Sequence, residues 1–364
     1  MAIAVSFFVI IVAVAVSSGF RHTIREGVAA MTGDIRIAPY VSTEGEPVPV
    51  PRTLPSEAKI LSIPGVKEIT PVAVRAGIVK NGDIVHGVVV KGIPSEEGPM
   101  TVSIPCRLSE ITGLGEGDDL TTYFVGEKVK VRKFRITKIH SDILEMDDNL
   151  LVYARLEDIQ RLNGWDSTQV SCLDVLLRSD SRERMEEISA LIGHQLLTGG
   201  HEEEEVLYVA PSSRTYSQVF SWLDLLDNNV LLILILMTVV AGFNMVSGLL
   251  IMLMRNIPTI GTLKTMGMTD KAIGKLFVRV SAGAVLKGML IGNALALLFC
   301  LIQGTTHIIP LDPANYFVPW VPVHVNPIGI LLADAAAFAG ILLLLWLPSR
   351  VVATIDPAKT VKAD

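Results

Sequence analysis

The sequence predicts an α-helical membrane protein with four transmembrane helices and a large α+β domain inserted between the first and the second. Three observations lead to this fold class. Half of the 364 residues are apolar, and only 19% are charged. The apolar residues gather in four stretches long enough to cross a bilayer. Residues 20–227, between the first two stretches, have an ordinary soluble composition with both strand and helix patterns.

The four predicted transmembrane helices occupy residues 1–19, 228–254, 281–303 and 327–347. The second is the clearest, because the 25 residues from 230 to 254 carry no charge. At about 1.5 Å per residue, this run can cross a hydrocarbon core of about 30 Å. Short connections complete the membrane part, with a loop over 255–280, a second loop over 304–326 and a tail over 348–364.

The first span begins almost at residue 1 and has no basic residue before it. The alternative is a secretory signal peptide, with Ala15-Val16-Ser17 as a cleavage-like site. Phe20, Ile24 and Val28 continue a helical period beyond the span, which favours a helix that leaves the membrane without a break. The missing basic residues are explained if the natural start lies upstream.

Charge predicts the orientation of the chain. Residues 255–287 contain six basic residues and one acid, whereas the loop over 304–326 contains no Lys or Arg. By the positive-inside rule, the 255–280 loop and the C-terminus are cytoplasmic. Four spans then place the N-terminus in the cytoplasm too, and residues 20–227 outside. This external domain is acidic, with 22 basic and 31 acidic residues from 21 to 224.

The external domain is predicted to be a mixed α+β fold in which early and late strands pair and bring both ends back to the membrane. Its strongest local signal is the hairpin turn Lys80-Asn81-Gly82-Asp83. An amphipathic helix over 216–227 leads into the second span and places Trp222 at the membrane interface. The predicted strands are 34–38, 69–79, 84–93, 118–124, 127–131, 134–140, 150–153, 172–177 and 203–209, and the predicted helices are 56–63, with Ser56 as N-cap, 108–114, 155–162 and 182–197.

Three features of this domain allow a functional and a structural interpretation. The basic cluster of Lys128, Lys130, Arg132, Lys133, Arg135 and Lys138 is either a docking surface for an acidic partner or an edge strand protected by charge. The run His201-Glu202-Glu203-Glu204-Glu205 is either a cation patch or, as we expect, a solvated loop. Cys106 and Cys172 are either two free thiols, which we favour, or a disulfide.

The spans contain packing and polar signals. Small residues recur every four positions in the third span, at Ala284, Gly288, Gly292 and Ala296. This spacing predicts a groove in which another helix of the chain packs closely. Asn244, Asn293 and Asp334 are polar residues that should face protein or water. Asp334 alone, with no second acid or His in the spans, gives little support to a proton relay.

The chain lacks the phosphate-binding loop Gly-x-x-x-x-Gly-Lys-Ser/Thr and the Gly-x-Gly-x-x-Gly dinucleotide motif. It also lacks Gly-x-Ser-x-Gly and His-Glu-x-x-His, and no Cys/His spacing indicates a metal site. We therefore expect a non-catalytic chain without a cofactor of its own, whose energy comes from a partner. Nothing in the sequence indicates a nucleic-acid partner.

Several motifs resemble the FtsX-like permeases of ABC transporters, and the closest likeness is to the lipoprotein-releasing permeases of the Lol type. The likeness runs nearly from end to end of the chain. The residues that carry it are Ser18-Gly19-Phe20, Met31-Thr32-Gly33, Val89-Val90-Lys91-Gly92-Ile93, Leu162-Asn163-Gly164-Trp165, residues 241–248 (AGFNMVSG), residues 260–267 (IGTLKTMG), Leu347-Pro348-Ser349-Arg350 and Ile355-Asp356-Pro357-Ala358.

The resemblance implies a permease dimer, formed by two copies or by a paralogue, with two ATPase subunits that bind ATP and Mg on the cytoplasmic side. It further implies that residues 258–266 form the coupling helix that docks in the ATPase. The family usually has an acid next to the basic residue at the start of this loop, whereas this chain has Arg255-Asn256. The implied coupling residues are Pro258, Ile260, Gly261, Leu263, Lys264, Met266 and Gly267.

In the Lol branch, the first two spans of both subunits line a cavity for the acyl chains of a lipoprotein, and the periplasmic domain passes this cargo to a soluble carrier. The resemblance therefore places the chain in the bacterial inner membrane. The alternatives are a MacB-like efflux permease and an FtsX-like mechanotransmitter to a cell-wall hydrolase. The cargo-cavity candidates, each of which could instead pack against lipid or other helices, are Phe7, Phe8, Ile11, Val14, Val239, Phe243 and Val246.

Overall fold

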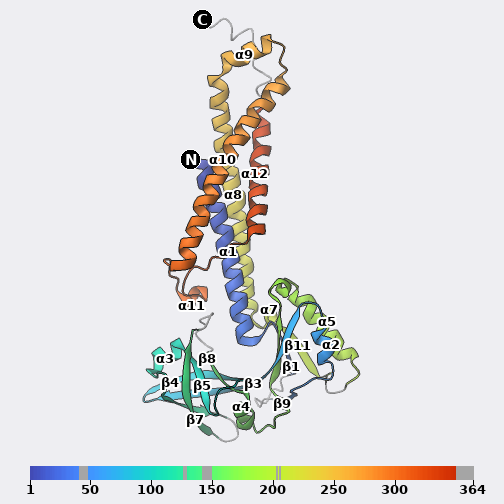
Figure 1. Ribbon diagram of the computed structural model, residues 1–364, viewed down its shortest axis with the longest axis vertical. Helices are drawn as coiled ribbons and strands as arrows, with labels where there is room; N and C mark the ends of the chain where they lie inside the picture. Colours follow the sequence, from blue (N-terminus) through green and yellow to red (C-terminus); the bar gives the residue numbers. More distant parts are fainter. Residues whose placement is uncertain (41–47, 126–128, 142–149, 202–203, 205, 350–364) are drawn as a thin grey trace. The chain divides into compact units, whose positions relative to one another are not determined.

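The computed structural model describes residues 1–40, 48–125, 129–141, 150–201, 204 and 206–349 (Figure 1). The chain divides into two compact units, which are described separately. The first, the helical unit, comprises Met1–His22, Ser221–Leu311 and Trp320–Asp364. The second, the sheet unit, comprises Thr23–Phe220 and Asp312–Pro319. The motif Ile355-Asp356-Pro357-Ala358, which contributes to the family resemblance, lies outside the described residues.

Among the described residues, four helices are long and apolar enough to cross a membrane, as the sequence predicts. They extend beyond the predicted spans, and the added residues include Gly27 in the first helix and Gly274 in the third, so neither glycine ends its helix. The 255–280 segment is correspondingly more helical than a loop, since it contains a separate short helix and the first turns of the next long one. The helices are α1 (Ala2–Thr32), α8 (Ser217–Arg255), α9 (Ile257–Thr265), α10 (Asp270–Thr306), α11 (Pro313–Tyr316) and α12 (Pro327–Ser349).

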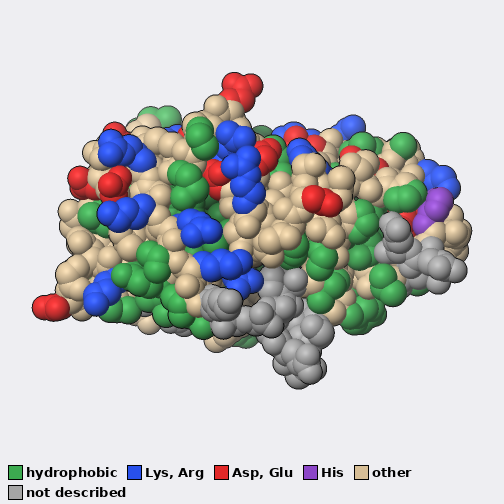
Figure 2. All heavy atoms as spheres, turned by 90° about the horizontal axis from the view of Figure 1, so that it is seen from below, with side chains coloured by type: hydrophobic (Ala, Val, Ile, Leu, Met, Phe, Trp, Pro, Cys, Tyr) green, Lys and Arg blue, Asp and Glu red, His purple; other side chains and the backbone are tan. Residues whose placement is uncertain are grey.

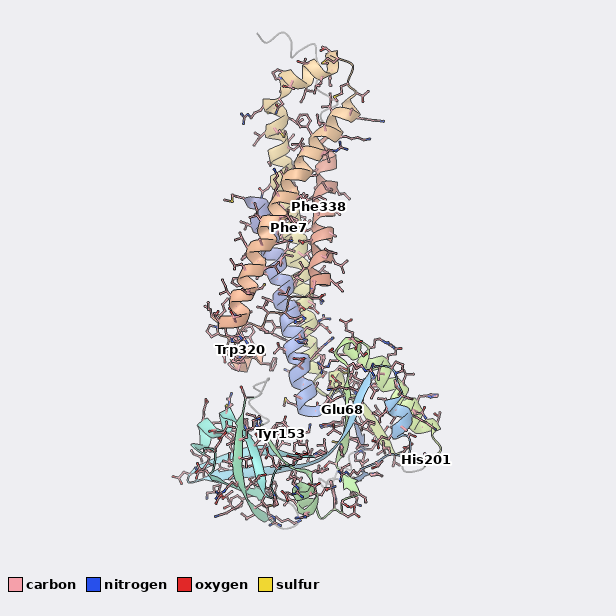
Figure 3. All side chains as sticks on the ribbon, viewed as in Figure 1. Phe7, Glu68, Tyr153, His201, Trp320 and Phe338 are labelled. Atoms are coloured by element: carbon pink, nitrogen blue, oxygen red, sulfur yellow. The ribbon has the colours of Figure 1, made fainter. Side chains whose placement is uncertain are left out.

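The core of the helical unit is apolar and draws on all four long helices. Phe7 and Ile11 of α1 are fully buried there, together with Ala241 of α8, Ala296 of α10 and Ala337 of α12. Figure 3 labels Phe7 and Phe338 among the side chains of this bundle. Small residues on three of the helices allow their backbones to approach, which is how helices pack when lipid offers no hydrophobic driving force.

The sheet unit contains one continuous series of nine strands, in the order β11-β1-β10-β3-β4-β8-β5-β7-β6. The predicted pairing of early and late strands is confirmed, because β1 pairs antiparallel with β11, Ile35 opposite Pro211. The strands are β1 (Ile35–Pro39), β2 (Val50–Pro51), β3 (Val66–Asn81), β4 (Ile84–Ile93), β5 (Thr101–Pro105), β6 (Asp119–Phe124), β7 (Lys130–His140), β8 (Leu150–Arg155), β9 (Gln169–Val170), β10 (Cys172–Leu177) and β11 (Leu207–Pro211).

The last six strands of this series close into a barrel. The end of β3 pairs with β6, Ile78 opposite Tyr123, so β6 meets the strand from which the six-strand series starts. The first half of β3 pairs instead with β10, outside the barrel. One 16-residue strand therefore belongs to both halves of the unit. The helices of the unit are α2 (Glu57–Leu61), α3 (Cys106–Thr112), α4 (Leu156–Asn163), η1 (Ser179–Arg184), α5 (Met185–Thr198) and α7 (Ser212–Thr215).

The sheet unit differs from the prediction in several places. The strands β2, β5 and β9 and the helix α7 were not predicted, and the two strands expected at 127–131 and 134–140 are a single strand, β7. The helix expected over 182–197 is divided into η1 and α5, and the last strand begins at Leu207 instead of 203. In β7 the adjacent residues Arg132 and Lys133 interrupt the alternation of polar and apolar residues, but both still pair with β6. A prediction from the sequence pattern therefore divides a strand that is continuous in the structure.

Candidate functional site

The segment that the resemblance implies for ATPase coupling forms a compact helical turn. The helix α8 ends at Arg255, and the Asn256 side chain donates to the carbonyl oxygen of Met252 at 2.7 Å. This bond satisfies one of the last carbonyls of α8. The backbone oxygen of Asn256 then accepts from Ile260 at 2.9 Å and starts α9. Where the family usually has an acid, the asparagine thus ends one helix and begins the next.

The end of α9 explains the Thr-Met-Gly part of the motif. Gly267 has φ +89°, a backbone conformation that side chains with a Cβ rarely adopt. Its amide donates to the oxygen of Lys264 at 3.0 Å, and the Met268 amide donates to the oxygen of Leu263 at 3.0 Å. These two bonds are the Schellman arrangement that ends a helix. The chain can therefore turn sharply from α9 towards α10.

The implied coupling residues divide between two faces of α9. Ile260 and Gly261 are buried against the helical unit. Pro258, Met266 and Gly267 are exposed, and the Met266 side chain is 79% exposed. Leu263 and Lys264 are half-buried between the two faces. A partner could therefore contact the outer face, while the inner face holds α9 on the bundle.

The candidate cargo residues also separate by burial. Phe7 and Ile11 of α1 are fully buried in the core, so in this conformation they are packing residues. Phe8 and Val14 of α1 and Val246 of α8 are half-buried. Val239 and Phe243 of α8 are exposed, Phe243 by 65%. The structure thus places the accessible candidates on α8.

The helix α8 presents an exposed face that mixes apolar, polar and small residues. Only 11% of the most apolar 18-residue segment of α8 is buried, against 44% of the corresponding segment of α1. Val240, Asn244, Ser247, Gly248 and Ile251, spaced three and four apart, are all exposed. Lipid can cover the apolar members, but a carboxamide exposed to hydrocarbon is unfavourable. This face is one that sequence reasoning missed, although the spacing of Asn244, Ser247 and Gly248 could have indicated it.

The small residues of α10 lie against α1. A Cβ built on Gly292 would lie 2.5 Å from the backbone oxygen of Ala4, and one on Gly288 would lie 2.7 Å from Ile3. Ala296 is buried, whereas Ala284 is exposed. The groove therefore starts at Gly288 and receives a helix of the same chain. Nearby, Asn293 of α10 donates to Asp334 of α12 at 2.5 Å, which gives the acid a protein partner.

Polar contacts join α1 and α8 close to the predicted ends of their spans. Ser17 donates to Asp227 at 2.6 Å, and Arg21 forms an ion pair with the same carboxylate. The rings of Phe20 and Trp222 meet edge to face, with centroids 5.5 Å apart. A belt of charged and aromatic side chains of this kind is typical of the level at which helices leave a membrane.

In the sheet unit, a buried charge cluster holds the end of α1. The Lys91 ammonium donates to the backbone oxygen of Met31 and to Asp174, both at 2.8 Å. Asp174 also accepts from Arg36 at 2.8 Å. Lys91 and Asp174 are buried, and the lysine supplies a cation at the C-terminus of a helix, where positive charge is favourable. A lysine within the apolar strand Val89-Val90-Lys91 was the sequence signal for this cluster.

The basic cluster of β7 has different strand neighbours along its length. The strand β7 pairs with β6 over residues 130–135 and with β5 over residues 135–140. Lys130, Arg132 and Lys133 therefore have a paired strand on one side only, and the edge-strand interpretation stays a prediction for them. Lys128 lies outside the described residues. On the face seen in Figure 2, Lys and Arg side chains are interspersed with Asp and Glu. Arg135 of β7 forms an ion pair with Asp119 of β6, with 3.4 Å between the charged groups.

Glu204 corrects the expectation of a solvated loop at 201–205. Its side chain is fully buried and accepts from the Ser56 amide at 2.7 Å and the Ser56 hydroxyl at 2.6 Å. Ser56 is therefore the residue before α2, as predicted, but its hydroxyl binds Glu204 instead of capping the helix. Glu202, Glu203 and Glu205 lie outside the described residues.

All three cysteines are free thiols, with Cys106 exposed and Cys172 buried. Burial, followed by the nearby Asp174 carboxylate, raises the pKa of the Cys172 thiol to about 12. Among the described residues, no group of three or more His, Cys, Asp and Glu side chains could hold a metal ion.

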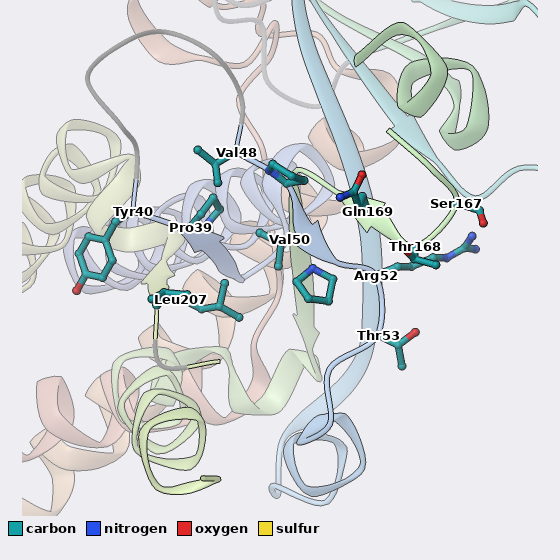
Figure 4. Close-up of a pocket in the computed structure, with 13 residues that line it drawn as sticks. Pro39, Tyr40, Val48, Val50, Arg52, Thr53, Ser167, Thr168, Gln169 and Leu207 are labelled. Atoms are coloured by element: carbon teal, nitrogen blue, oxygen red, sulfur yellow. The ribbon is translucent and has the colours of Figure 1, made fainter. Parts of the chain in front are cut away.

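The sheet unit contains a cavity of about 830 Å³ beside β2 and β9 (Figure 4). Apolar and proline side chains, among them Pro39, Val50 and Leu207, form much of its wall. Arg52 is its charged side chain, and Thr53 and Thr168 contribute hydroxyls. The Tyr40 ring lies at its margin, 5.6 Å from that of Tyr208. This arrangement contains no nucleophile–base pair.

Comparison with known proteins finds a family model that matches the C-terminal part of the chain. Residues 231–357 match the model of the FtsX-like permease C-terminal domain. Among curated proteins, the chain is similar to the lipoprotein-releasing system transmembrane protein LolE of Haemophilus influenzae. The two are 23% identical in an alignment that covers 99% of this chain and 92% of that protein.

Two solved structures resemble the chain over about half of its length. The periplasmic region of MacB from Actinobacillus actinomycetemcomitans is 13% identical with a TM-score of 0.34, and it covers 54% of this chain and 95% of its own. The extracellular domain of the ABC-type transporter YknZ from Gram-positive bacteria is 14% identical with a TM-score of 0.30, and it covers 48% of this chain and 98% of its own.

Proposed function

We propose that this chain is an ABC permease of the FtsX-like type. In this proposal it is the membrane subunit of an ATP-driven complex, which releases lipoproteins from the inner membrane to a periplasmic carrier. The name of the Haemophilus relative assigns lipoprotein release to that protein, and the alignment covers nearly all of this chain. In this proposal the sheet unit is periplasmic and α9 is cytoplasmic, in accord with the distribution of basic residues.

The exposed face of α8 is the observation that carries the proposal. Asn244, Ser247 and Gly248 give this face a polar and small centre within a span. Burying such a centre against a second permease subunit would satisfy the carboxamide and allow close helix approach. Phe243 and Val239, beside that centre, would then border the space between the subunits. An apolar space of this kind suits acyl chains.

The chain supplies no ATP-binding motif, so the work must come from a partner ATPase that binds ATP and Mg. The outer face of α9, with Pro258 and Met266 exposed, is the surface that we assign to this partner. The inner face, through Ile260, packs on the same core as α8 and α10. A push on α9 would therefore reach the helices that border the proposed cargo space.

The energetic problem is the removal of lipid chains from the bilayer, which costs about 0.8 kcal/mol per CH₂ group. An apolar space next to α8 reduces this cost, because the chains pass from lipid to protein without contacting water. Closure of the space by ATP binding in the partner would then expel them. This task requires apolar surface and movement, and it requires no catalytic side chain in the permease.

The test is reconstitution of the permease with its ATPase in vesicles that contain a lipoprotein. We expect release of the lipoprotein to a soluble carrier that depends on ATP. In cells, cross-linking at Phe243 should capture lipoproteins. Capture of a cell-wall hydrolase without lipoprotein would support the mechanotransmitter instead. ATP-dependent export of a soluble compound without lipoprotein release would support the MacB-like alternative.

A further inference from the structure

The start of α10 carries its charged side chains on one side of the helix. Lys271, Lys275 and Arg279 follow one another at intervals of four residues, and all three are exposed. Ile273 and Phe277, from the same turns, are buried in the core of the helical unit. Residues four apart lie on the same side of a helix. The three cations therefore form a ridge on the outer side of α10, which we call the α10 basic ridge.

The α10 basic ridge has little negative charge near it in the chain. From residue 255 to residue 306 the sequence contains a single acid, Asp270, which is the first residue of α10. Within the part of the chain that the structure describes, none of the three cations forms an ion pair. Their charge is therefore available to a partner outside the chain.

The ridge is unfavourable for the helix that carries it. Like charges four residues apart repel each other, and the ridge contains two such pairs. Lys271 also lies in the first turn of α10, where the helix dipole disfavours positive charge. The positive-inside rule explains basic residues in this part of the chain, but it does not require them to be aligned on one exposed side. An anion outside the chain would offset the repulsion.

The ridge lies next to the predicted membrane boundary. Figure 1 shows α10 as one unbroken helix, and its predicted span begins at residue 281. Arg279, Lys275 and Lys271 precede that residue by about 3, 9 and 15 Å of helix. The headgroup layer is about 5–8 Å thick, and long basic side chains can lean along a helix towards it. Arg279 therefore lies at the level of the headgroups, Lys275 reaches their outer border, and Lys271 lies within about one Debye length of that border.

Apolar side chains beside the ridge indicate the class of anion. Leu276 and Val280 each follow a cation of the ridge by one position, and both are exposed. Cations next to exposed apolar residues are typical of helices at a membrane interface. An anionic phospholipid offers a phosphate group to the cations and hydrocarbon to the apolar side chains. This combination favours a lipid over a soluble acidic protein.

We infer that the α10 basic ridge binds the phosphate groups of anionic phospholipids in the leaflet that surrounds the start of α10. In the orientation proposed above this is the cytoplasmic leaflet, whose surface is negatively charged in cells. Arg279 can bind a phosphate group through two parallel hydrogen bonds, whereas the two lysines act as point charges. The inference goes beyond the proposed function, because it requires only that α10 crosses the membrane and is independent of the cargo.

Lipid-specific quenching of a fluorophore tests the inference. Val280→Cys in a Cys106→Ala background is labelled in the full chain, whose other cysteines are buried. The protein is placed in phosphatidylcholine vesicles with an equal, small fraction of either brominated phosphatidylglycerol or brominated phosphatidylcholine, since bromine quenches only at short range. We expect phosphatidylglycerol to be enriched about fivefold at the label, which is the effect of one cation at an anionic surface. Leu301→Cys, exposed near the other end of the span where residues 288–306 contain no Lys or Arg, is the matched position and should show no enrichment.

Variants of the ridge assign the enrichment to its cations. Lys271→Gln/Lys275→Gln/Arg279→Gln should lower the enrichment at the Val280→Cys label below about twofold, because most of the nearby positive charge is removed. Lys271→Arg/Lys275→Arg keeps the charge and should preserve the enrichment. Added salt should weaken it in the unaltered ridge, because ions screen the attraction.

A charge-matched control separates the ridge from the net charge of the chain. Lys59→Gln/Lys67→Gln/Lys80→Gln removes three exposed cations from the sheet unit and should leave the enrichment unchanged. Equal quenching by the two lipids at Val280→Cys would overturn the inference, as would enrichment that survives the triple substitution of the ridge. If that triple variant kept the enrichment but lost binding of the ATPase, the ridge would be a protein contact instead. Lipoprotein release is assayed separately, so its failure would reject the proposed function and leave the lipid result intact.

Discussion

At the scale of single residues, the buried cluster around Asp174 is the clearest case in which one side chain joins two elements. Lys91 lies on β4 and binds both Asp174 of β10 and the last turn of α1. A buried ammonium is tolerated only when its charge and its hydrogen bonds are satisfied. The cluster therefore fixes the end of α1 on the sheet, which a mechanical role for that helix would require.

Lys91→Ala should lower the free energy of unfolding of the sheet unit by about 3 kcal/mol, because it leaves a buried carboxylate with one partner fewer. Thermal or denaturant unfolding of the purified protein measures this change. Lys80→Ala, on the exposed hairpin, is the control and should change stability by less than about 0.5 kcal/mol. Equal stability of the two variants would show that the cluster does not hold the helix end.

The thiols should differ in reactivity with pH. With a pKa of about 12, Cys172 has a thiolate fraction of about 10⁻⁴ at pH 8, and burial hinders access further. The thiolate fraction rises about tenfold per pH unit below the pKa, so any labelling of Cys172 should increase with pH. Maleimide labelling followed by mass spectrometry should modify Cys106 in the native protein and Cys172 only after unfolding. Rapid native labelling of Cys172 in a Cys106→Ala variant would contradict the structure.

At the scale of elements, the crossing of α1 and α10 depends on the absence of a side chain at one position. Gly292→Leu would place atoms against the Ala4 carbonyl and the Phe7 Cβ, at separations that backbone cannot yield easily. We expect a loss of at least 1–3 kcal/mol, as for overpacked cores, seen as a lower melting temperature in detergent. Ala284→Leu, on the same helix and exposed, should have little effect.

The proposed connection from α9 to a partner ATPase is tested by charge. Met266→Glu and Lys264→Glu should reduce transport relative to ATP hydrolysis, because both change the side of α9 that a partner can reach, while membrane insertion stays intact. Gly261 is buried, so a bulky residue there should disturb α9 itself. Lys80→Glu, on the hairpin of the sheet unit, is a charge-matched control. Full transport by both α9 variants would reject this assignment.

The elements that sequence predicts best are those with a local signal. An uncharged run identifies α8, and the turn Lys80-Asn81-Gly82-Asp83 identifies the β3–β4 hairpin. The closure of the barrel could not be predicted, because the pairing of Ile78 with Tyr123 depends on strands far apart in sequence. The basic residues of β7 are likewise interpretable only once both neighbours of that strand are known. The sequence pattern of a strand describes that strand alone, whereas the strand that pairs with it is determined by the whole fold.

The candidate coupling and cargo residues show the same difference between what a local sequence signal predicts and what only packing determines. The motif over 260–267 predicts the position of α9, and its helix end follows from Gly267. Which residues face outward depends on packing, so Ile260 and Met266, six residues apart in one motif, have opposite environments. The burial of Phe7 and Ile11 could not be derived from apolar character either, since Phe243 is as apolar and is exposed.

At the scale of the whole molecule, the polar centre of α8 predicts that this chain works as a pair with a second permease subunit. A photoreactive side chain in place of Ser247 should cross-link to a second permease subunit in native membranes, because Asn244, Ser247 and Gly248 need a protein surface. The same probe at Leu331 of α12, an apolar residue that is 70% exposed, should label lipid. Mass spectrometry of the Ser247 adduct then identifies the partner as an identical copy or a paralogue. Equal labelling of a permease subunit from both positions, or no such labelling from Ser247, would mean that something else covers this face of α8. The dimer arrangement on which the proposed cargo space depends would then have to be abandoned.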